Sequence, residues 1–296
     1  MSAANASTAT TEGTTVRRLA PAIVALALLT GCAVAPPGPA EVVPLNHLPA
    51  LTGDYFRMES REVGRAFHIY VRLPDGYDPD AADAWPTVYL TDGDSLFPIL
   101  AANHLFLTYD DGLPEAIVVG IAYGGFDRAT NRRSIDFQTP GAGVTAEQAG
   151  AGAFQRFLKT ELIPDIERRY RSDPSRRVLF GQSRGGAFVL YSAVTDPDLF
   201  WGRIASNPSI TPGIESLLET AAPSGRSDLG LVVVSGTRDR ADLQAEAARW
   251  LSAWEARTQR PWRLRGERVA GGTHAANAPD AYRRGMNWLF GAEPAP

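Results

Sequence analysis

The residue best suited to covalent chemistry in this sequence is Ser183, which lies in the segment Gly181-Gln-Ser-Arg-Gly-Gly186. An apolar run, residues 178–180, precedes this segment, and a second apolar run, residues 187–190, follows it. Gly-x-Ser-x-Gly between a strand and a helix is typical of a sharp turn that exposes the serine hydroxyl. Glycines surround such a turn because neighbouring backbone approaches where a Cβ would clash. We interpret Ser183 as a nucleophile; the alternative is a glycine-rich turn with an incidental serine.

A serine hydroxyl is a weak nucleophile, so it needs a general base and an acid that orients this base. In α/β-hydrolases the chain order is serine, then Asp or Glu, then histidine, each in a loop after a strand. Of the four histidines, only His274 follows Ser183, and it lies in a Gly-Gly loop after a predicted strand. We therefore assign His274 as the general base; the alternative is an incidental surface histidine.

The acid must lie between the serine and the histidine. Asp239 follows the apolar run 231–234 in a loop that contains a glycine, and Asp242 comes three residues later. Asp242 is equally suited to cap the next helix, so we prefer Asp239 as the acid. The alternative for Asp239 is a surface ion pair with Arg238 or Arg240.

A carbonyl under attack develops negative charge, which two backbone N–H groups must stabilise. We expect one donor at Arg184, directly after the serine, and the other at Asp94, in the loop after the third strand. The side chain of Asp94 is expected to matter little, and Asp92 is expected to brace the loop. No His, Cys or carboxylate cluster has metal-ligand spacing and no phosphate-binding motif is present in the sequence, so we expect no metal and no cofactor.

The elements that must position these residues alternate along the chain. We expect strands at 55–61, 65–73, 85–90, 116–122, 177–180, 203–206, 229–235 and 263–269, and helices at 96–109, 146–170, 185–195, 242–257 and 278–290. Residues 124–144 show no periodicity and are expected to form a long loop. This alternation predicts an α/β fold with a mostly parallel central sheet, helices on both faces and two antiparallel strands at its start.

The composition excludes some classes of function. A hydrophobic content of 44% with 21% charged residues allows a sizeable core in 296 residues. A formal charge of −4 argues against a nucleic-acid partner, which would need a basic surface. Cys32 is the only cysteine, so neither an intramolecular disulfide nor a multi-thiolate metal site can form.

The N-terminal region predicts export. Arg17 and Arg18 precede the apolar run 20–29, and Leu29-Thr-Gly-Cys32 follows. This is the pattern of a secretory signal, and its last four residues resemble the lipobox of bacterial lipoproteins. The resemblance implies cleavage before Cys32 and lipid attachment to it; the alternative is a cysteine without a role. We then expect a signal peptide at 1–31, a lipidated cysteine and flexible tether at 32–52, and the folded α/β domain at 53–296. The protein would be exported and anchored to a membrane on the periplasmic or cell-surface side.

Five segments together resemble one known family. It is the putative-esterase family of α/β-hydrolases, which includes enterochelin and other ferric-siderophore esterases, S-formylglutathione hydrolase, feruloyl esterases and mycolyltransferases. The segments occur in the family's order over roughly residues 53–290: Tyr89-Leu-Thr-Asp-Gly93, Gly181-Gln-Ser-Arg-Gly-Gly186, Asn207-Pro-Ser209, Gly236-Thr-Arg-Asp239 and Gly271-Gly-Thr-His274. The resemblance implies Ser183 as nucleophile, His274 as base, Asp239 as acid, and the Asp94 and Arg184 backbone as oxyanion hole. Gln182 stands where many members have His, and Asn207 where many have Ser.

The resemblance also bears on substrate. Residues 132–140 resemble the loop that precedes the helix in siderophore esterases. Arg132 and Arg133 in this loop, and Asn207 elsewhere, are candidates for substrate binding. Together with Arg128 and Arg184, these arginines could hold an anionic ester such as a ferric catecholate trilactone; alternatively, several of them solvate a loop or pair with nearby aspartates (Asp127 and Asp136). We therefore expect a serine esterase that acts on a small-molecule ester. The alternatives are an acyltransferase of the same fold and a non-catalytic, ligand-binding lipoprotein.

Overall fold

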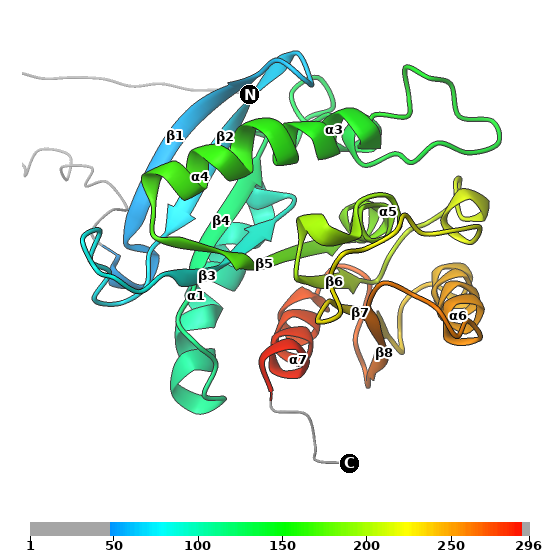
Figure 1. Cartoon of the computed structure of the whole chain (residues 1–296). Coiled ribbons are helices and arrows are strands. Elements are labelled where there is room, and N and C mark those ends of the chain that lie inside the picture. The colour runs from blue at the N-terminus through cyan, green and yellow to red at the C-terminus, as the bar shows by residue number, and fades with distance from the viewer. Residues whose placement is uncertain (1–47, 292–296) are drawn as a thin grey trace, which may run out of the picture. The chain divides into compact units, whose positions relative to one another are not determined.

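Eight strands form one sheet in the part of the chain that the computed structural model describes, residues 48–291 (Figure 1). The strands are β1 (Gly53–Ser60), β2 (Arg65–Arg72), β3 (Trp85–Leu90), β4 (Ile117–Ala122), β5 (Ser172–Gln182), β6 (Gly202–Ser206), β7 (Gly230–Gly236) and β8 (Arg263–Val269). Their order across the sheet is β1-β2-β4-β3-β5-β6-β7-β8. The pairs β1–β2 and β2–β4 are antiparallel and the other pairs are parallel, which confirms the predicted α/β architecture.

Helices cover both faces of the sheet. On one face lie α1 (Gly93–Asp110) and α7 (Ala278–Phe290), which contact each other (Figure 1). The other face carries α3 (Ala151–Phe157), which continues through a π-helical turn (Leu158–Leu162) into α4 (Ile163–Arg169), and also α5 (Arg184–Thr195) and α6 (Ala241–Glu255). The short elements are α2 (Arg133–Asp136) and the 3₁₀ turns Pro49–Leu51, Pro197–Leu199 and Glu215–Leu217.

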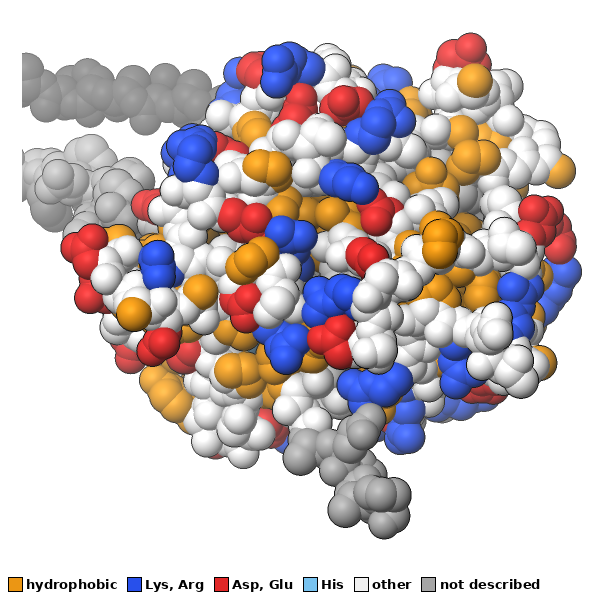
Figure 2. Space-filling view, viewed as in Figure 1, with side chains coloured by type: hydrophobic (Ala, Val, Ile, Leu, Met, Phe, Trp, Pro, Cys, Tyr) orange, Lys and Arg blue, Asp and Glu red, His pale blue; other side chains and the backbone are white. Residues whose placement is uncertain are grey.

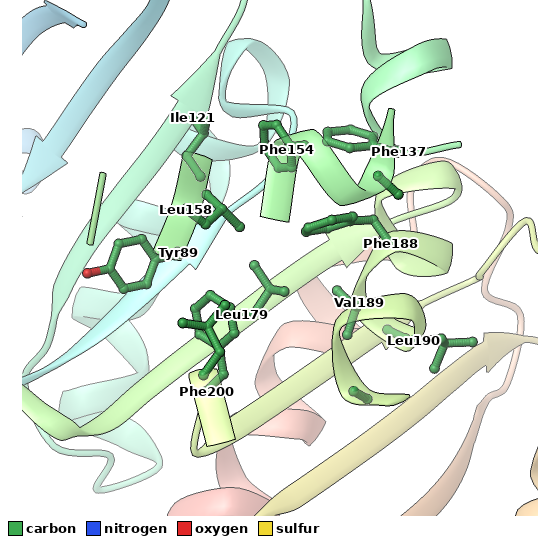
Figure 3. Close-up of a cluster of buried hydrophobic side chains, with 14 of the residues drawn as sticks. Tyr89, Ile121, Phe137, Phe154, Leu158, Leu179, Phe188, Val189, Leu190 and Phe200 are labelled. Carbon is green, nitrogen blue, oxygen red and sulfur yellow. The ribbon is translucent and has the colours of Figure 1, made fainter. Parts of the chain in front are cut away.

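β4 is apolar throughout, and β3, β5, β6 and β7 each contain an apolar run, because both faces of the sheet are covered there. In β3, Val88 and Leu90 pack towards α1 and α7, whereas Tyr89 between them packs on the opposite face. On that opposite face, Phe154 of α3 and Phe188 of α5 stand with their ring centroids 5.0 Å apart (Figure 3). Burying each such side chain contributes about 1.5–3 kcal/mol to the stability of the fold. This packing fixes the strands, and thereby the loops at their ends.

Three predicted elements differ from the structure. The strand expected at 177–180 extends over Ser172–Gln182 as β5. The helix expected from residue 146 begins at Ala151, because residues 145–150 form a turn in which the Gln148 side chain accepts a hydrogen bond from the Thr145 N–H at 3.0 Å. Gly150 then lies against the Ile135 carbonyl, where a Cβ would come within 2.7 Å of its oxygen. The expected loop 124–144 holds the single helical turn α2.

The surface shown in Figure 2 intersperses acidic and basic side chains. Between residues 48 and 291, no helix is both long enough and apolar enough to cross a membrane. Cys32, the predicted signal peptide and the predicted tether up to residue 47 lie outside the described residues.

Candidate active site

The predicted catalytic residues lie at one edge of the sheet. Ser183 follows β5, Asp239 follows β7 and His274 follows β8, while Asp92 and Asn207 follow β3 and β6. All of these strands are parallel, so their carboxyl ends meet at the same edge. Open α/β sheets place their ligand sites at this edge.

A chain of hydrogen bonds joins the serine to an acid. His274 Nε2 lies 2.9 Å from Ser183 Oγ, and His274 Nδ1 lies 2.9 Å from Asp239 Oδ1. A carboxylate only accepts hydrogen bonds, so Asp239 favours the tautomer that carries its proton on Nδ1. Nε2 is then the free base that faces the hydroxyl, which is the arrangement that general-base catalysis needs.

The hydrogen bonds and the burial of Asp239 and Asp242 show which of these two residues contacts His274. The Asp239 side chain is 1% exposed and also accepts the Arg240 backbone N–H at 2.7 Å. Asp242 is 55% exposed and pairs with the Arg240 guanidinium instead. The structure therefore brings Asp239, and not Asp242, into contact with His274.

Ser183 sits on a strained turn between β5 and α5. Its backbone has φ 60° and ψ −118°, a conformation that costs a non-glycine residue about 1–3 kcal/mol. Two backbone hydrogen bonds hold it there: its N–H donates to the Ser206 carbonyl at 2.9 Å, and its own carbonyl accepts the Ser209 N–H at 3.0 Å. A Cβ on Gly181 would lie 2.2 Å from the Gly185 carbonyl oxygen, so glycine is required for the turn to close.

The two expected oxyanion donors lie at the starts of helices. Arg184 is the first residue of α5 and Asp94 is the second residue of α1, so both N–H groups precede the hydrogen-bond ladder of their helix. Helix N-termini carry partial positive charge, which suits a developing oxyanion. The two helix starts pack together, since a Cβ on Gly185 would lie 2.4 Å from the Thr91 hydroxyl.

The expectation that the side chain of Asp94 matters little is wrong. Its two carboxylate oxygens accept the backbone N–H groups of Tyr123 and Gly124, each at 2.7 Å. The carboxylate thereby ties the start of α1 to the loop after β4. Sequence reasoning missed this role because the partners lie 29 and 30 residues away.

Asp92 braces the same loop, as expected. It adopts φ 55°, and its carboxylate accepts two hydrogen bonds from Arg133, at 2.5 Å from Nε and 2.9 Å from Nη2. Burial raises the pKa of Asp92, and the hydrogen bonds and charge of Arg133 oppose this rise. Arg133 also reaches the Gln182 carbonyl at 3.4 Å, so it links the loop to the residue before the nucleophile.

Three of the four candidate arginines line one cavity, which we call the arginine cavity. Its volume is about 460 Å³, and it is lined by Phe126, Arg128, Asn131, Arg133, Ser134 and Arg184. Arg132 is exposed at the start of α2 and is not among these lining residues. The alternative ion-pair partners are engaged elsewhere: Asp136 pairs with Arg65 at 2.5 Å, and Asp127 accepts the backbone N–H groups of Ala129 and Thr130.

Asn207 is placed behind the catalytic residues rather than in a cavity. It is 1% exposed. Its Nδ2 donates to the carbonyls of Thr273 and His274 at 2.9 and 3.1 Å, and its Oδ1 accepts from the Gly236 N–H and from Asn277 Nδ2, each at 2.9 Å. The side chain thus connects the histidine loop to the loop that carries the acid.

Gln182 supports the same loop, because its Nε2 also donates to the His274 carbonyl. The sequence predicted Asn207 as a substrate-binding residue and noted Gln182 only as a departure from the family pattern, so the support that both give to the histidine loop was missed. The available signal was a polar residue at the carboxyl end of β5 and another directly after β6. Within residues 48–291, no group of three or more His, Cys, Asp or Glu side chains is placed to hold a metal ion.

Comparison with protein families decides the classification. The model of the family described as "Putative esterase" matches residues 60–286. The chain belongs to this family.

Curated relatives and solved structures agree with this assignment. The chain is 34% identical over 166 residues to the ferri-bacillibactin esterase BesA of Bacillus subtilis, covering 52% of this chain and 57% of BesA. It is 27% identical over 165 residues to the apo-salmochelin esterase of Escherichia coli, covering 52% of this chain and 50% of that protein. The chain spans about half the length of these curated relatives. The siderophore hydrolase EstB of Aspergillus nidulans superposes with a TM-score of 0.71 at 22% identity, over 88% of this chain and 99% of that one, which shows the α/β-hydrolase fold.

Proposed function

We propose that this protein is a serine esterase that cleaves small esters through an acyl-enzyme. The observation that carries the proposal is the hydrogen-bonded chain Asp239–His274–Ser183, in which both distances involving His274 are 2.9 Å. The strained backbone of Ser183 between β5 and α5 supports the same conclusion, because strained backbone conformations cluster at active sites. Membership of the esterase family adds independent support.

In the proposed reaction, Ser183 Oγ attacks the ester carbonyl while His274 Nε2 takes its proton. Asp239 stabilises the imidazolium that forms, and the N–H groups of Asp94 and Arg184 bind the oxyanion. The tetrahedral intermediate collapses, and His274 returns the proton to the departing alcohol. Water then gives its proton to His274 and attacks the acyl-enzyme, which releases the acid and restores the Ser183 hydroxyl.

Siderophore-type esters are the substrates that we propose. The names of BesA and the apo-salmochelin esterase support this class. The arginine cavity supports it independently, because it contains Arg184, the residue whose backbone N–H is proposed for the oxyanion hole. Guanidinium groups beside the reacting carbonyl favour an anionic ester. The positive charge of Arg133 is partly neutralised in this cavity, because its Nε and Nη2 already donate to the Asp92 carboxylate.

A substrate panel tests this proposal. Wild-type protein and the Ser183→Ala variant are assayed against a ferric tricatecholate trilactone, a feruloyl ester and a short aliphatic ester. We expect the trilactone to have the highest kcat/KM and the variant to be inactive on every ester. Activity confined to neutral short-chain esters would exclude the anionic substrate, and full activity of the variant would exclude the mechanism.

The two alternatives are less well supported. An acyltransferase would need a second alcohol bound in place of water, and a non-catalytic binding lipoprotein would have no use for the assembled hydrogen bonds at Ser183. Product analysis with added alcohol distinguishes transfer from hydrolysis.

We also propose that the mature protein is an exported lipoprotein anchored through Cys32. The support is the order of the basic pair, the apolar run and Leu29-Thr-Gly-Cys32 in the sequence. Detergent-phase partition of the wild type and its loss in Cys32→Ala is the expected result. Equal partition of both proteins would refute the anchor.

A further inference from the structure

A second cavity opens beside the proposed oxyanion loop, and its wall includes four aromatic rings. Its volume is about 600 Å³, and its rings belong to Tyr55, Tyr70, Phe97 and Phe126; we call it the aromatic cavity. The rings of Tyr55 and Tyr70 lie 5.1 Å apart, and those of Tyr70 and Phe97 lie 5.6 Å apart in a stacked arrangement. Tyr55 is 54% exposed and Phe126 is 75% exposed, so two of the rings still have faces open to a ligand. Large exposed aromatic residues around one hollow are typical of a binding site.

The aromatic cavity is built to keep its shape. The Tyr55 hydroxyl is hydrogen-bonded to His68 Nδ1 at 2.7 Å, which fixes the one tyrosine of β1 against β2. His68 in turn lies against Gly124, where a Cβ would come within 2.6 Å of His68 Nε2. A preformed aromatic wall loses little conformational freedom when a ligand binds.

The position of the aromatic cavity connects it to the reaction. Gly93 and Asp94, which supply the proposed oxyanion loop, belong to its lining. The Asp94 carboxylate holds the N–H groups of Tyr123 and Gly124, and this loop leads directly to Phe126. Phe126 lines the arginine cavity as well. The two cavities therefore meet at Phe126, one containing Asp94 and the other Arg184.

The charges of the two cavities are opposite. Among the residues that line the aromatic cavity, the charged ones are Asp54 and Asp94. Burial raises the pKa of Tyr70, and the nearby Tyr55 and Asp94 raise it further, so Tyr70 presents a neutral phenol. The Asp54 carboxylate accepts the Tyr170 hydroxyl, and the Asp94 carboxylate accepts the Tyr123 and Gly124 N–H groups. No Lys, Arg or His is among the residues that line the aromatic cavity. An uncharged ring can therefore stack on this wall, whereas an anionic ring would leave water without a cation to pair with.

We propose that the aromatic cavity is a substrate subsite for an uncharged aryl ring, separate from the anion-binding arginine cavity. The subsite rests on the proposed esterase function and states its specificity. An ester held between the Asp94 and Arg184 N–H groups has one side in each cavity. Among simple monoesters, one that carries a neutral aryl group on one side of the scissile bond is therefore hydrolysed faster than its alkyl counterpart.

The test compares three simple esters by pH-stat. Ethyl acetate carries no ring, ethyl phenylacetate carries one on the acyl side, and benzyl acetate carries one on the alcohol side. We expect one of the two aryl esters to exceed ethyl acetate in kcat/KM by about tenfold or more, because burying a phenyl ring stabilises the bound transition state enough to raise kcat/KM by that factor. Ethyl 4-carboxyphenylacetate, whose ring is anionic, should lose the advantage if the ring on the acyl side is preferred, and 4-carboxybenzyl acetate should lose it if the alcohol side is preferred.

Variants locate the effect. Tyr55→Ala and Phe126→Ala should reduce the ratio of aryl to ethyl acetate kcat/KM to near one, whereas Tyr55→Phe should retain most of it because the ring remains. Phe106→Ala is the matched control, since Phe106 is an exposed aromatic residue of α1 outside both cavities, and it should leave the ratio unchanged. A wild type without aryl preference, or a preference that survives both alanine variants, would overturn the subsite. Absence of all ester hydrolysis and of fluorophosphonate labelling would instead overturn the esterase function itself.

Discussion

The role of Asn207 makes a demanding prediction, because this residue touches no substrate in the proposed mechanism. Replacing it by alanine removes four hydrogen bonds at once. Two are donated by its Nδ2 to the carbonyls of Thr273 and His274, and two are accepted by its Oδ1 from the Gly236 N–H and from Asn277 Nδ2. Asn207 is also one of three non-glycine residues with positive φ in the described part of the chain. Asparagine tolerates this conformation better than alanine does.

The magnitude follows from these contacts. A buried hydrogen bond contributes about 1 kcal/mol net, and each partner left unsatisfied costs more, so Asn207→Ala should lower the free energy of unfolding by about 3–5 kcal/mol. Without its brace, the His274 carbonyl keeps only the Gln182 amide among the side chains that hold it. A displacement of the imidazole by about 1 Å should reduce kcat by about 100-fold with little change in KM.

Two measurements check this prediction. Urea denaturation gives the change in stability, and steady-state hydrolysis of one ester gives kcat and KM in the folded range. Asn287→Ala serves as the control, because Asn287 lies on α7, away from the site, and its side-chain amide donates to Asp111, which follows α1. A folded Asn207→Ala protein with kcat within about twofold of the wild type would refute the argument that this amide positions the base.

Two further predictions follow from the buried polar groups. Asp239→Asn should reduce kcat by about 10³–10⁴-fold because the amide no longer enforces the productive tautomer, whereas Asp242→Asn should leave kcat unchanged; equal losses in steady-state kinetics would mean that the acid is misassigned. His104 is buried between the Pro114 carbonyl and the Tyr282 hydroxyl, and burial, aided by the charge of Arg72, lowers its pKa from 6.5 to about 4. The unfolded chain therefore binds a proton between pH 6.5 and 4 that the folded protein does not, so acidification across this window should lower the free energy of unfolding by about 3 kcal/mol. Denaturation curves at several pH values should show this loss in the wild type and a smaller loss in His104→Gln.

The catalytic residues could be predicted because their signals are local. Ser183 sits among glycines between two apolar runs, and Asp239 and His274 each follow a predicted strand within a few residues. A parallel sheet then brings these loop positions to one edge, whatever the details of packing. The same reasoning gave the order of strands and helices, since covered parallel strands are continuously apolar.

The supporting contacts could not be predicted, because they join loops that are distant in sequence. Asn207 meets His274 across 67 residues, and Asp94 meets Tyr123 across 29. Whether a polar residue at a strand end faces solvent, substrate or another loop depends on how far each loop folds back. The aromatic cavity is a similar case, since its rings come from β1, β2, α1 and the loop after β4.

In the proposed mechanism, Ser183 is a nucleophile activated by His274. The most direct test of this mechanism is covalent labelling of the purified protein with a fluorophosphonate, followed by peptide mass spectrometry. We expect one adduct per chain, located on Ser183, absent from Ser183→Ala and formed much more slowly in His274→Ala. A wild type that takes up no label, or an adduct that persists in Ser183→Ala, would contradict the mechanism.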